Sequence, residues 1–182
     1  RVAARYAVAM TPAMVAAAAS VGIPRFDDQN GAMMEGAGGV AIANLRIRDG
    51  RRRNLPMDYL YPAMSRPNLT VLTGAEVQQL TLQGTKVTGL RFVRNGQVQT
   101  VRAAQRVVAC AGAINTPKLL MLSGIGDAPE LARHGIRVAA RVPGVGRNFQ
   151  DHVLVAGCIW EYPTALPPAN NLAEATFFLS LI

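Results

Sequence analysis

The sequence predicts an α/β fold, in which helical segments flank a run of β-strands. The clearest signal is a strand-to-helix junction. Residues 106–111 form a short apolar run with paired valines, typical of a strand buried in a parallel sheet, and a helical pattern follows. Residues 69–101 alternate apolar and polar side chains at the period of a strand. Strand patterns next to helical patterns indicate mixed α/β architecture.

The N-terminal region predicts a helix, a long loop and a short helix. Thr11 is a good N-cap and Pro12 suits the first helical position, so a helix is expected from there to Gly22, which ends it. The side chains expected on its core-facing side are Met14, Val15 and Ala18. Glycines and mixed polar residues over 23–54 indicate a loop with at most short strands, and residues 55–65 a short helix.

The central region predicts a β-meander followed by a return to helix. Strands are expected over residues 69–73, 77–82, 87–93 and 97–101. Asn95-Gly96 is the strongest hairpin signal, because both residues tolerate positive φ. Thr116 as N-cap and Pro117 as first helical residue predict a helix that ends at Gly124. A short helix over 129–134, closed by Gly135, and a strand over 136–142 are expected before a glycine-rich loop.

Composition and charge argue against two classes of partner. With 182 residues and 50% hydrophobic content the chain can bury one sizeable core, and no apolar run approaches the roughly 20 residues that cross a bilayer. The net charge of +8 suggests nucleic acid, and five arginines gather around Asp49-Gly50: Arg46, Arg48, Arg51, Arg52 and Arg53. No aromatic residues lie between them to stack bases, so a solvated hairpin tip is the better interpretation. We expect neither a nucleic acid nor a membrane as partner.

The cysteines and histidines predict neither a disulfide nor a metal site. Cys110 falls in the predicted buried strand and Cys158 in an apolar stretch, so both are expected to be packed thiols. No close pair of ligands offers a zinc or haem site. The expected location is therefore the reducing cytoplasm.

Two motifs carry a family resemblance. The first reads Gly-Ala-x-x-Thr-Pro-x-Leu-Leu-x-x-Ser-Gly-Ile-Gly over residues 112–126, and the second reads Pro-Gly-Val-Gly-x-Asn-Phe-Gln-Asp-His over residues 143–152. In this order and spacing they resemble the glucose-methanol-choline (GMC) family of FAD-dependent oxidoreductases. The resemblance implies that FAD is the cofactor and that a small-molecule alcohol is oxidised by hydride transfer to the flavin. It also implies part of a Rossmann-like FAD-binding domain with a β-meander, plus part of a substrate-binding domain.

The resemblance divides the chain into three stretches of one internal fragment. Residues 1–66 are expected to be a helix, long loop and short helix of the substrate domain. Residues 67–152 are expected to belong to the FAD-binding domain, and residues 153–182 to begin the substrate-binding domain. The family's pyrophosphate loop and catalytic histidine match nothing here, so no catalytic residue is expected. The fragment alone is expected to be inactive, to need the remainder of the parent chain, and to self-associate through strand edges or residues 177–182.

Three residues are the expected cofactor contacts: Val77, Ala111 and Gly112. In the resembled family the last residue of a Thr-Gly-Ala-x-Val turn pairs its backbone with the FAD adenine, and residues 73–77 match that turn. Ala111 and Gly112 are the next candidates, for close approach to the adenosine side of FAD. The alternatives are a core valine and an ordinary strand-helix junction.

Two other site patterns fail on their context. Residues 36–41 fit the letters of the G-x-G-x-x-A dinucleotide fingerprint, but no buried strand precedes them and no helix follows. A loop near the flavin or the substrate entrance is the better interpretation. Ser123, Asp151 and His152 are the residue types of a hydrolase triad, yet Ser123 lies outside a G-x-S-x-G elbow. Neighbouring Asp151 and His152 would also point in opposite directions in a strand.

The substrate is expected to be a neutral alcohol rather than choline. In choline-oxidising members of the resembled family a glutamate follows Gln-Asp-His closely and faces the trimethylammonium group. Here the corresponding residues are the apolar Val153, Leu154 and Val155. A ligand-free structural module without activity of its own is the remaining alternative.

Overall fold

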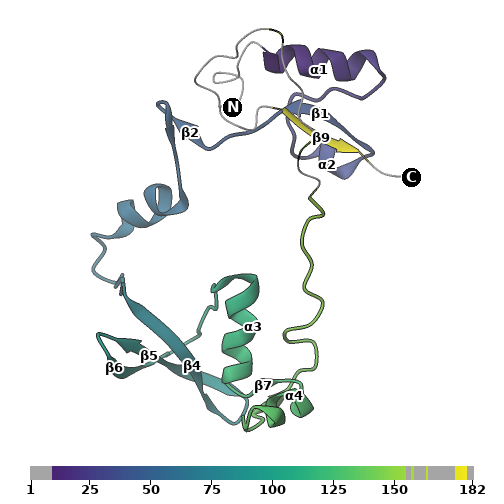
Figure 1. Ribbon diagram of the computed structural model, residues 1–182. Coiled ribbons are helices and arrows are strands. Elements are labelled where there is room, and N and C mark those ends of the chain that lie inside the picture. Colours follow the sequence, from purple (N-terminus) through teal and green to yellow (C-terminus); the bar gives the residue numbers. More distant parts are fainter. Residues whose placement is uncertain (1–9, 155–156, 158–162, 164–174, 180–182) are drawn as a thin grey trace. The chain divides into compact units, whose positions relative to one another are not determined.

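The computed structural model describes residues 10–154, 157, 163 and 175–179 (Figure 1). The chain divides into two compact units, Arg1–Leu69 with Cys158–Ile182, and Thr70–Gly157. Within the described residues no helix is both long enough and apolar enough to span a membrane. The assignment of the three sequence stretches to FAD-binding and substrate-binding domains stays a prediction.

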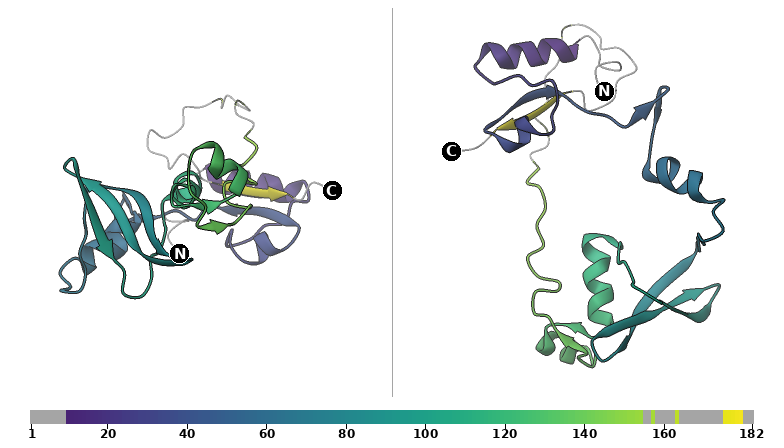
Figure 2. Two further views of the ribbon diagram at one scale, coloured as in Figure 1. Left: turned by 90° about the horizontal axis from the view of Figure 1, so that it is seen from below. Right: turned by 180° about the vertical axis from the view of Figure 1, so that it is seen from behind.

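The first unit is built on a helix packed against a two-stranded sheet. Strand β1 (Gly38–Ile42) pairs antiparallel with β9 (Ala175–Leu179), and helix α1 (Met10–Ser20) lies beside them, as Figure 1 and the right-hand view of Figure 2 show. Val15 and Ala18 of α1 meet Val40 of β1 in the buried core. The short helix α2 (Ala32–Glu35) adds the fully buried Met33.

The predicted N-terminal helix is confirmed, but two of its details are wrong. Thr11 lies inside α1 and is buried, so it is not the N-cap. Met14 is 40% exposed, whereas Val15 and Ala18 are in the core as predicted. Buried positions on α1 recur at spacings of three and four residues, and Met14 lies outside that stripe.

The loop and short helix predicted next are largely confirmed. Residues 23–54 contain α2 and three short strands: β1, β2 (Ile47–Arg48) and β3 (Arg51–Arg52). β2 and β3 form a hairpin whose tip residues, Asp49 and Gly50, have positive φ, as expected for the arginine-rich tip. The helical segment is a π-helix over Pro56–Leu60 and a 3-10 helix over Tyr61–Ala63. Pro62 has no N–H to continue an α-helical ladder, which explains the change of type.

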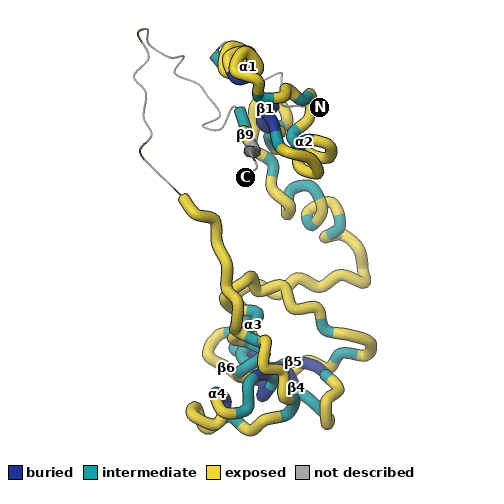
Figure 3. The backbone as a smooth tube through the Cα atoms, turned by 90° about the vertical axis from the view of Figure 1, so that its right-hand side faces the viewer, coloured by how far each residue is buried: buried dark blue, intermediate teal, exposed yellow. Residues whose placement is uncertain are grey.

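The second unit contains the predicted β-meander. Strands β4 (Ala75–Gln83), β5 (Lys86–Arg94) and β6 (Gln97–Arg102) form an antiparallel sheet in the order β4-β5-β6. Asn95 and Gly96 both have positive φ in the β5–β6 turn, as predicted. Helix α3 (Gly112–Leu122) contacts β4, and Leu80 and Phe92 are the buried side chains of the sheet. The dark blue segments of Figure 3 show how small this buried core is.

A smaller set of elements follows α3. Strand β7 (Ile125–Gly126) pairs in parallel with β8 (Ala140–Arg141), and helix α4 (Ala128–Arg133) connects them, with Leu131 fully buried. The helix predicted over 129–134 and its end at Gly135 are therefore confirmed. Of the strand predicted over 136–142, only β8 forms.

Two predicted strands are absent from the described part of the chain. Residues 69–73 and 106–111 pair with no strand there, and Val108 is 73% exposed. A β-strand needs a neighbouring strand to bond its backbone N–H and C=O groups. An apolar sequence pattern does not show whether such a neighbour is present, so the pattern alone predicted these two strands wrongly. Cys110 is consequently exposed rather than packed, which corrects the prediction for that thiol. Cys158 lies outside the described residues.

The start of the central helix is also different from the prediction. α3 begins at Gly112, so Thr116 and Pro117 lie inside it instead of at its N-cap and first position. The helix ends as predicted at Gly124, which has a φ of +82°. The additional turn consists of Gly112, Ala113, Ile114 and Asn115.

Candidate functional site

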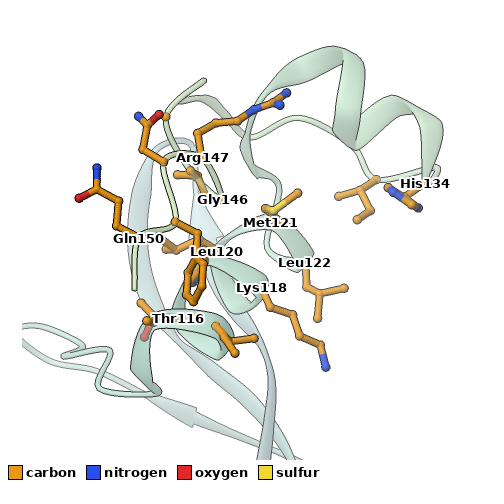
Figure 4. Close-up of a pocket in the computed structure, with 17 residues that line it drawn as sticks. Thr116, Lys118, Leu120, Met121, Leu122, His134, Gly146, Arg147 and Gln150 are labelled. Atoms are coloured by element: carbon orange, nitrogen blue, oxygen red, sulfur yellow. The ribbon is translucent and has the colours of Figure 1, made fainter. Parts of the chain in front are cut away.

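The two sequence motifs line a single cavity in the second unit. The cavity has a volume of about 1050 Å³ and lies between α3 and the glycine-rich segment 144–150 (Figure 4). Its lining is mostly apolar and comes in similar parts from α3 and from residues 144–150, while Lys118, His134 and Arg147 add polar groups. The sequence revealed both motifs, but it did not reveal that they line the same cavity. The only sequence feature that pointed to a shared site was the short separation of the two motifs along the chain.

Three contacts hold the glycine-rich segment against α3 and its neighbours. Gly146 has a φ of +75°, which favours glycine, and a side-chain carbon there would lie 3.2 Å from Sδ of Met121, so the backbone passes close to the helix. The parallel β7–β8 pair joins Ile125–Gly126, which follow α3, to Ala140–Arg141, which precede the glycine-rich segment. Arg147 Nη2 and Asp127 Oδ2 form an exposed ion pair at 3.4 Å, a type of contact that contributes little stability.

The N-terminal end of α3 presents backbone donors. Ala111 is the residue before the helix, and its side chain makes no cap hydrogen bond. Its N–H donates instead to Oγ1 of Thr116 at 3.1 Å. Gly112 follows with a φ of +84°, and open space lies where a side chain would start. The first amides of a helix have no intrahelical acceptor and form its positive dipole end, which suits an anionic group.

Val77 lies on a sheet edge. Val77 lies in β4 and pairs with Phe92 of β5; it is 41% exposed, and the register of the ladder shifts between Val77 and Gln79. Because β4 is the outer strand of the described sheet, backbone groups along one side of it are available to a ligand. A purine ring can use such backbone donors and acceptors.

Strand β4 and helix α3 are joined by hydrogen bonds between the middle of β4 and the C-terminal end of α3. Leu80 N–H donates to Oγ of Ser123 at 2.8 Å, and Nε2 of Gln79 donates to the carbonyl oxygen of Leu122 at 3.1 Å. Ser123 Oγ in turn donates to the Leu119 carbonyl oxygen at 2.6 Å. The three predicted contact residues therefore lie on two connected elements of one unit. Among the described residues no hydrogen bond links Val77 to Ala111 or Gly112, and their role stays a prediction.

Ser123 has a structural position that the sequence did not reveal. It is only 4% exposed, and both functions of its hydroxyl are used within the fold. Asp151 and His152 are exposed, and the Asp151 carboxylate accepts the His152 N–H at 2.8 Å. His134 ends α4 and lies 3.4 Å from the carboxylate of Glu130. No hydrogen bond connects Ser123 with Asp151 or His152 in the described part of the chain.

The glycines of residues 36–41 occupy the wrong place for a dinucleotide fingerprint. β1 begins at Gly38 and α2 precedes it, so these glycines lead from a helix into a strand. A pyrophosphate loop needs the opposite order, strand then helix N-terminus. The structure confirms that this context fails.

The residues around α3 fit one end of a dinucleotide. Gly112 leaves open space, the adjacent amides are donors, and the edge of β4 offers backbone groups for a base. Lys118 and Arg147 place positive charge at the neighbouring cavity. In the described residues no group of three or more potential ligand side chains gathers to hold a metal.

Relatives of known identity match most of this chain. The mitochondrial choline dehydrogenase of Homo sapiens is 40% identical over 141 residues, which cover 78% of this chain and 23% of the relative. The oxygen-dependent choline dehydrogenase of Staphylococcus haemolyticus is 45% identical over 139 residues, covering 76% of this chain and 24% of the relative. This chain thus spans about a quarter of the length of these relatives.

Solved structures agree with the sequence relatives. Pyridoxine 4-oxidase from Mesorbium loti superimposes with a TM-score of 0.72 at 40% identity, over 80% of this chain and 28% of that structure. An FAD-dependent oxidoreductase from Chaetomium thermophilum gives a TM-score of 0.71 at 29% identity, over 80% of this chain and 25% of that structure. The predicted fold class is confirmed by these neighbours, and the predicted cofactor, FAD, agrees with the family they represent.

The family profile described as GMC oxidoreductase matches residues 2–154 and therefore includes both motifs. Together with relatives of 40–45% identity, this match confirms the predicted resemblance. The chain belongs to the GMC oxidoreductases.

Proposed function

We propose that the protein of which this chain is a part oxidises an alcohol with FAD, and that this chain contributes the adenosine side of the cofactor site. The observation that carries the proposal is the open N-terminal end of α3 at Gly112, next to the cavity formed by both family motifs. When bound, FAD supplies the flavin that accepts a hydride from the alcohol carbon.

Each predicted contact residue has a distinct part in this proposal. The backbone of Val77, on the outer edge of β4, would hydrogen-bond the adenine. Gly112 would allow close approach of the ribose and phosphate side to the first amides of α3. The N–H of Ala111 is already used by Thr116, so Ala111 would contribute its small side chain and carbonyl oxygen.

The exposed thiol of Cys110 tests this assignment because it directly precedes Ala111. We expect FAD to slow alkylation of Cys110 by at least about tenfold in the full-length protein, since a bound adenosine would cover the thiol. Peptide mass spectrometry of the alkylated apoprotein and FAD-bound protein measures this rate at Cys110 alone.

Nucleotide fragments separate the two ends of the cofactor in the same experiment. AMP should protect Cys110, whereas riboflavin at equal occupancy should not. Equal alkylation rates with and without bound FAD would show that the adenosine lies away from Ala111 and Gly112.

We further propose a neutral aliphatic or aromatic alcohol as the substrate. Val153 and Leu154 are exposed and apolar, and neither offers a carboxylate to the quaternary ammonium of choline. The sequence relatives reported above are choline dehydrogenases, whereas a solved structure at 40% identity is a pyridoxine oxidase. The proposal of a neutral alcohol therefore rests on the residues that follow the second motif and not on these names.

The full-length protein should oxidise benzyl alcohol with a kcat/KM at least about tenfold above that for choline. A tenfold ratio corresponds to roughly 1.4 kcal/mol, the loss expected when the fixed cation of choline has no carboxylate partner. Steady-state rates with both substrates at one saturating acceptor concentration give the ratio. A higher kcat/KM for choline would contradict the proposal.

The isolated 182-residue chain is proposed to be inactive. Residues 106–111 lie exposed without a strand neighbour in the described part of the chain, which favours association with the remainder of the parent or between copies. A cytoplasmic location is also proposed, on the free thiol of Cys110.

A further inference from the structure

Thr116 lies one turn inside α3, yet its hydroxyl acts on the residue before the helix. Its Oγ1 accepts the N–H of Ala111 at 3.1 Å. Ala111 has φ −87° and ψ 7°, in the sparsely populated region between helix and strand, and no cap bond of its own. Among the described residues, the Thr116 hydroxyl is thus the hydrogen-bond acceptor that holds the Ala111 backbone in this conformation.

Pro117 makes this hydrogen bond more important. Proline has no N–H, so the α-helical bond to the carbonyl oxygen of Ala113 is missing at the point where the first turn joins the rest of α3. The first turn is consequently attached by fewer backbone bonds than an ordinary helical turn. The bond from Ala111 to Thr116 spans the same turn and replaces part of the lost constraint.

We propose that Thr116 is a positioning residue for the adenosine side of FAD. By engaging the Ala111 N–H, it fixes the turn at Gly112 so that the free amides of α3 face the open space there. Thr116 does not itself need to contact the cofactor. The inference rests on the proposed function, because it assumes that adenosine binds at Ala111 and Gly112.

The full-length apoprotein with Thr116→Val tests the proposal, because valine keeps the shape of threonine and removes the acceptor. The dissociation constant of FAD, followed by flavin fluorescence, should rise about five- to tenfold, as expected for loss of one hydrogen bond that orders a binding turn. Thr116→Ser keeps the hydroxyl and should restore the constant to within about twofold of the original. Thr116→Ala is measured in parallel, so that the result does not depend on the folding of one variant.

Thr88→Val is the matched control for a purely structural role. Thr88 Oγ1 donates to the Thr81 carbonyl oxygen at 3.1 Å and lies 3.2 Å from the Thr81 hydroxyl, so its side chain also bonds the backbone of another residue, but within the β4–β5 hairpin and outside α3. This variant should lower the unfolding temperature by a similar amount and leave the FAD dissociation constant unchanged. Similar weakening of FAD binding by Thr88→Val and Thr116→Val would overturn the positioning role.

Hydrogen exchange at the Ala111 amide separates this inference from the proposed function. The apoprotein of Thr116→Val should exchange this amide about tenfold faster, whether or not adenosine binds there. Faster exchange with an unchanged FAD dissociation constant would overturn the inference, and so would unchanged exchange. Absence of Cys110 protection by FAD in the unaltered protein would instead count against the proposed function.

Discussion

Replacing Gly124 by alanine is expected to lower the unfolding temperature of the protein by about 10 °C. Gly124 has a φ of +82°, and a methyl group there would collide with the carbonyl oxygen of Arg137, a backbone atom that cannot rotate away. Placing alanine in the left-handed backbone region costs roughly 1–2 kcal/mol, and the backbone shift that relieves the collision adds a similar amount. At about 2–4 °C per kcal/mol for a domain of this size, the sum accounts for the shift.

Gly135→Ala is the control for strain without collision. Gly135 has a φ of +67°, but nothing lies within 4 Å of the position where its methyl group would be. Its expected shift is about 3 °C, from roughly 1 kcal/mol of left-handed strain. Thermal unfolding followed by circular dichroism measures both variants, and equal shifts would contradict the packing assigned to Gly124.

Ser123→Ala is expected to cost roughly 2–3 kcal/mol, because the buried Leu80 N–H loses the Ser123 hydroxyl as its acceptor. The Leu119 carbonyl oxygen also loses the hydroxyl donor at 2.6 Å. Since β4 and α3 are joined here, the effect should be local opening between these elements. Hydrogen exchange at Leu80 should accelerate about 30- to 100-fold, the ratio that corresponds to this free energy.

Ser20→Ala is the matched control for Ser123→Ala. Ser20 Oγ donates to the Ala17 carbonyl oxygen at 2.7 Å, but the residue is exposed at the end of α1 and accepts no backbone N–H in the described structure. Its removal should cost less than about 0.5 kcal/mol, as for an ordinary surface substitution. If both serine variants gave equally small changes, the Ser123 bonds would not hold β4 to α3.

The parts of the fold that could be predicted are those whose partners lie close in sequence. Strands β4 to β6 follow one another through short turns, and the Asn95-Gly96 turn defines the β5–β6 register. The strand predicted over 106–111 failed because its apolar pattern contains no information about a neighbour. The start of α3 failed for a different reason: Thr116 and Pro117 are a good local start signal, but a helix can begin earlier when small residues precede it.

The candidate site was only partly accessible from sequence. The motifs identified the family and directed attention to Ala111 and Gly112. The hydrogen bond from Ala111 to Thr116 and the bond from Leu80 to Ser123 were not predictable, because each depends on the exact side-chain direction. The latter also joins residues separated by 43 positions, which no local pattern encodes.

The close approach of Gly146 to Met121 sets two separate costs on any substitution in the second motif. Alanine at position 146 would be strained at a φ of +75°, and its methyl group would lie 3.2 Å from the Met121 sulfur, which would have to shift by a few tenths of an ångström. A shorter residue at position 121 would remove the second cost but not the first. Glycine at position 146 is therefore expected to persist among homologues even where position 121 varies.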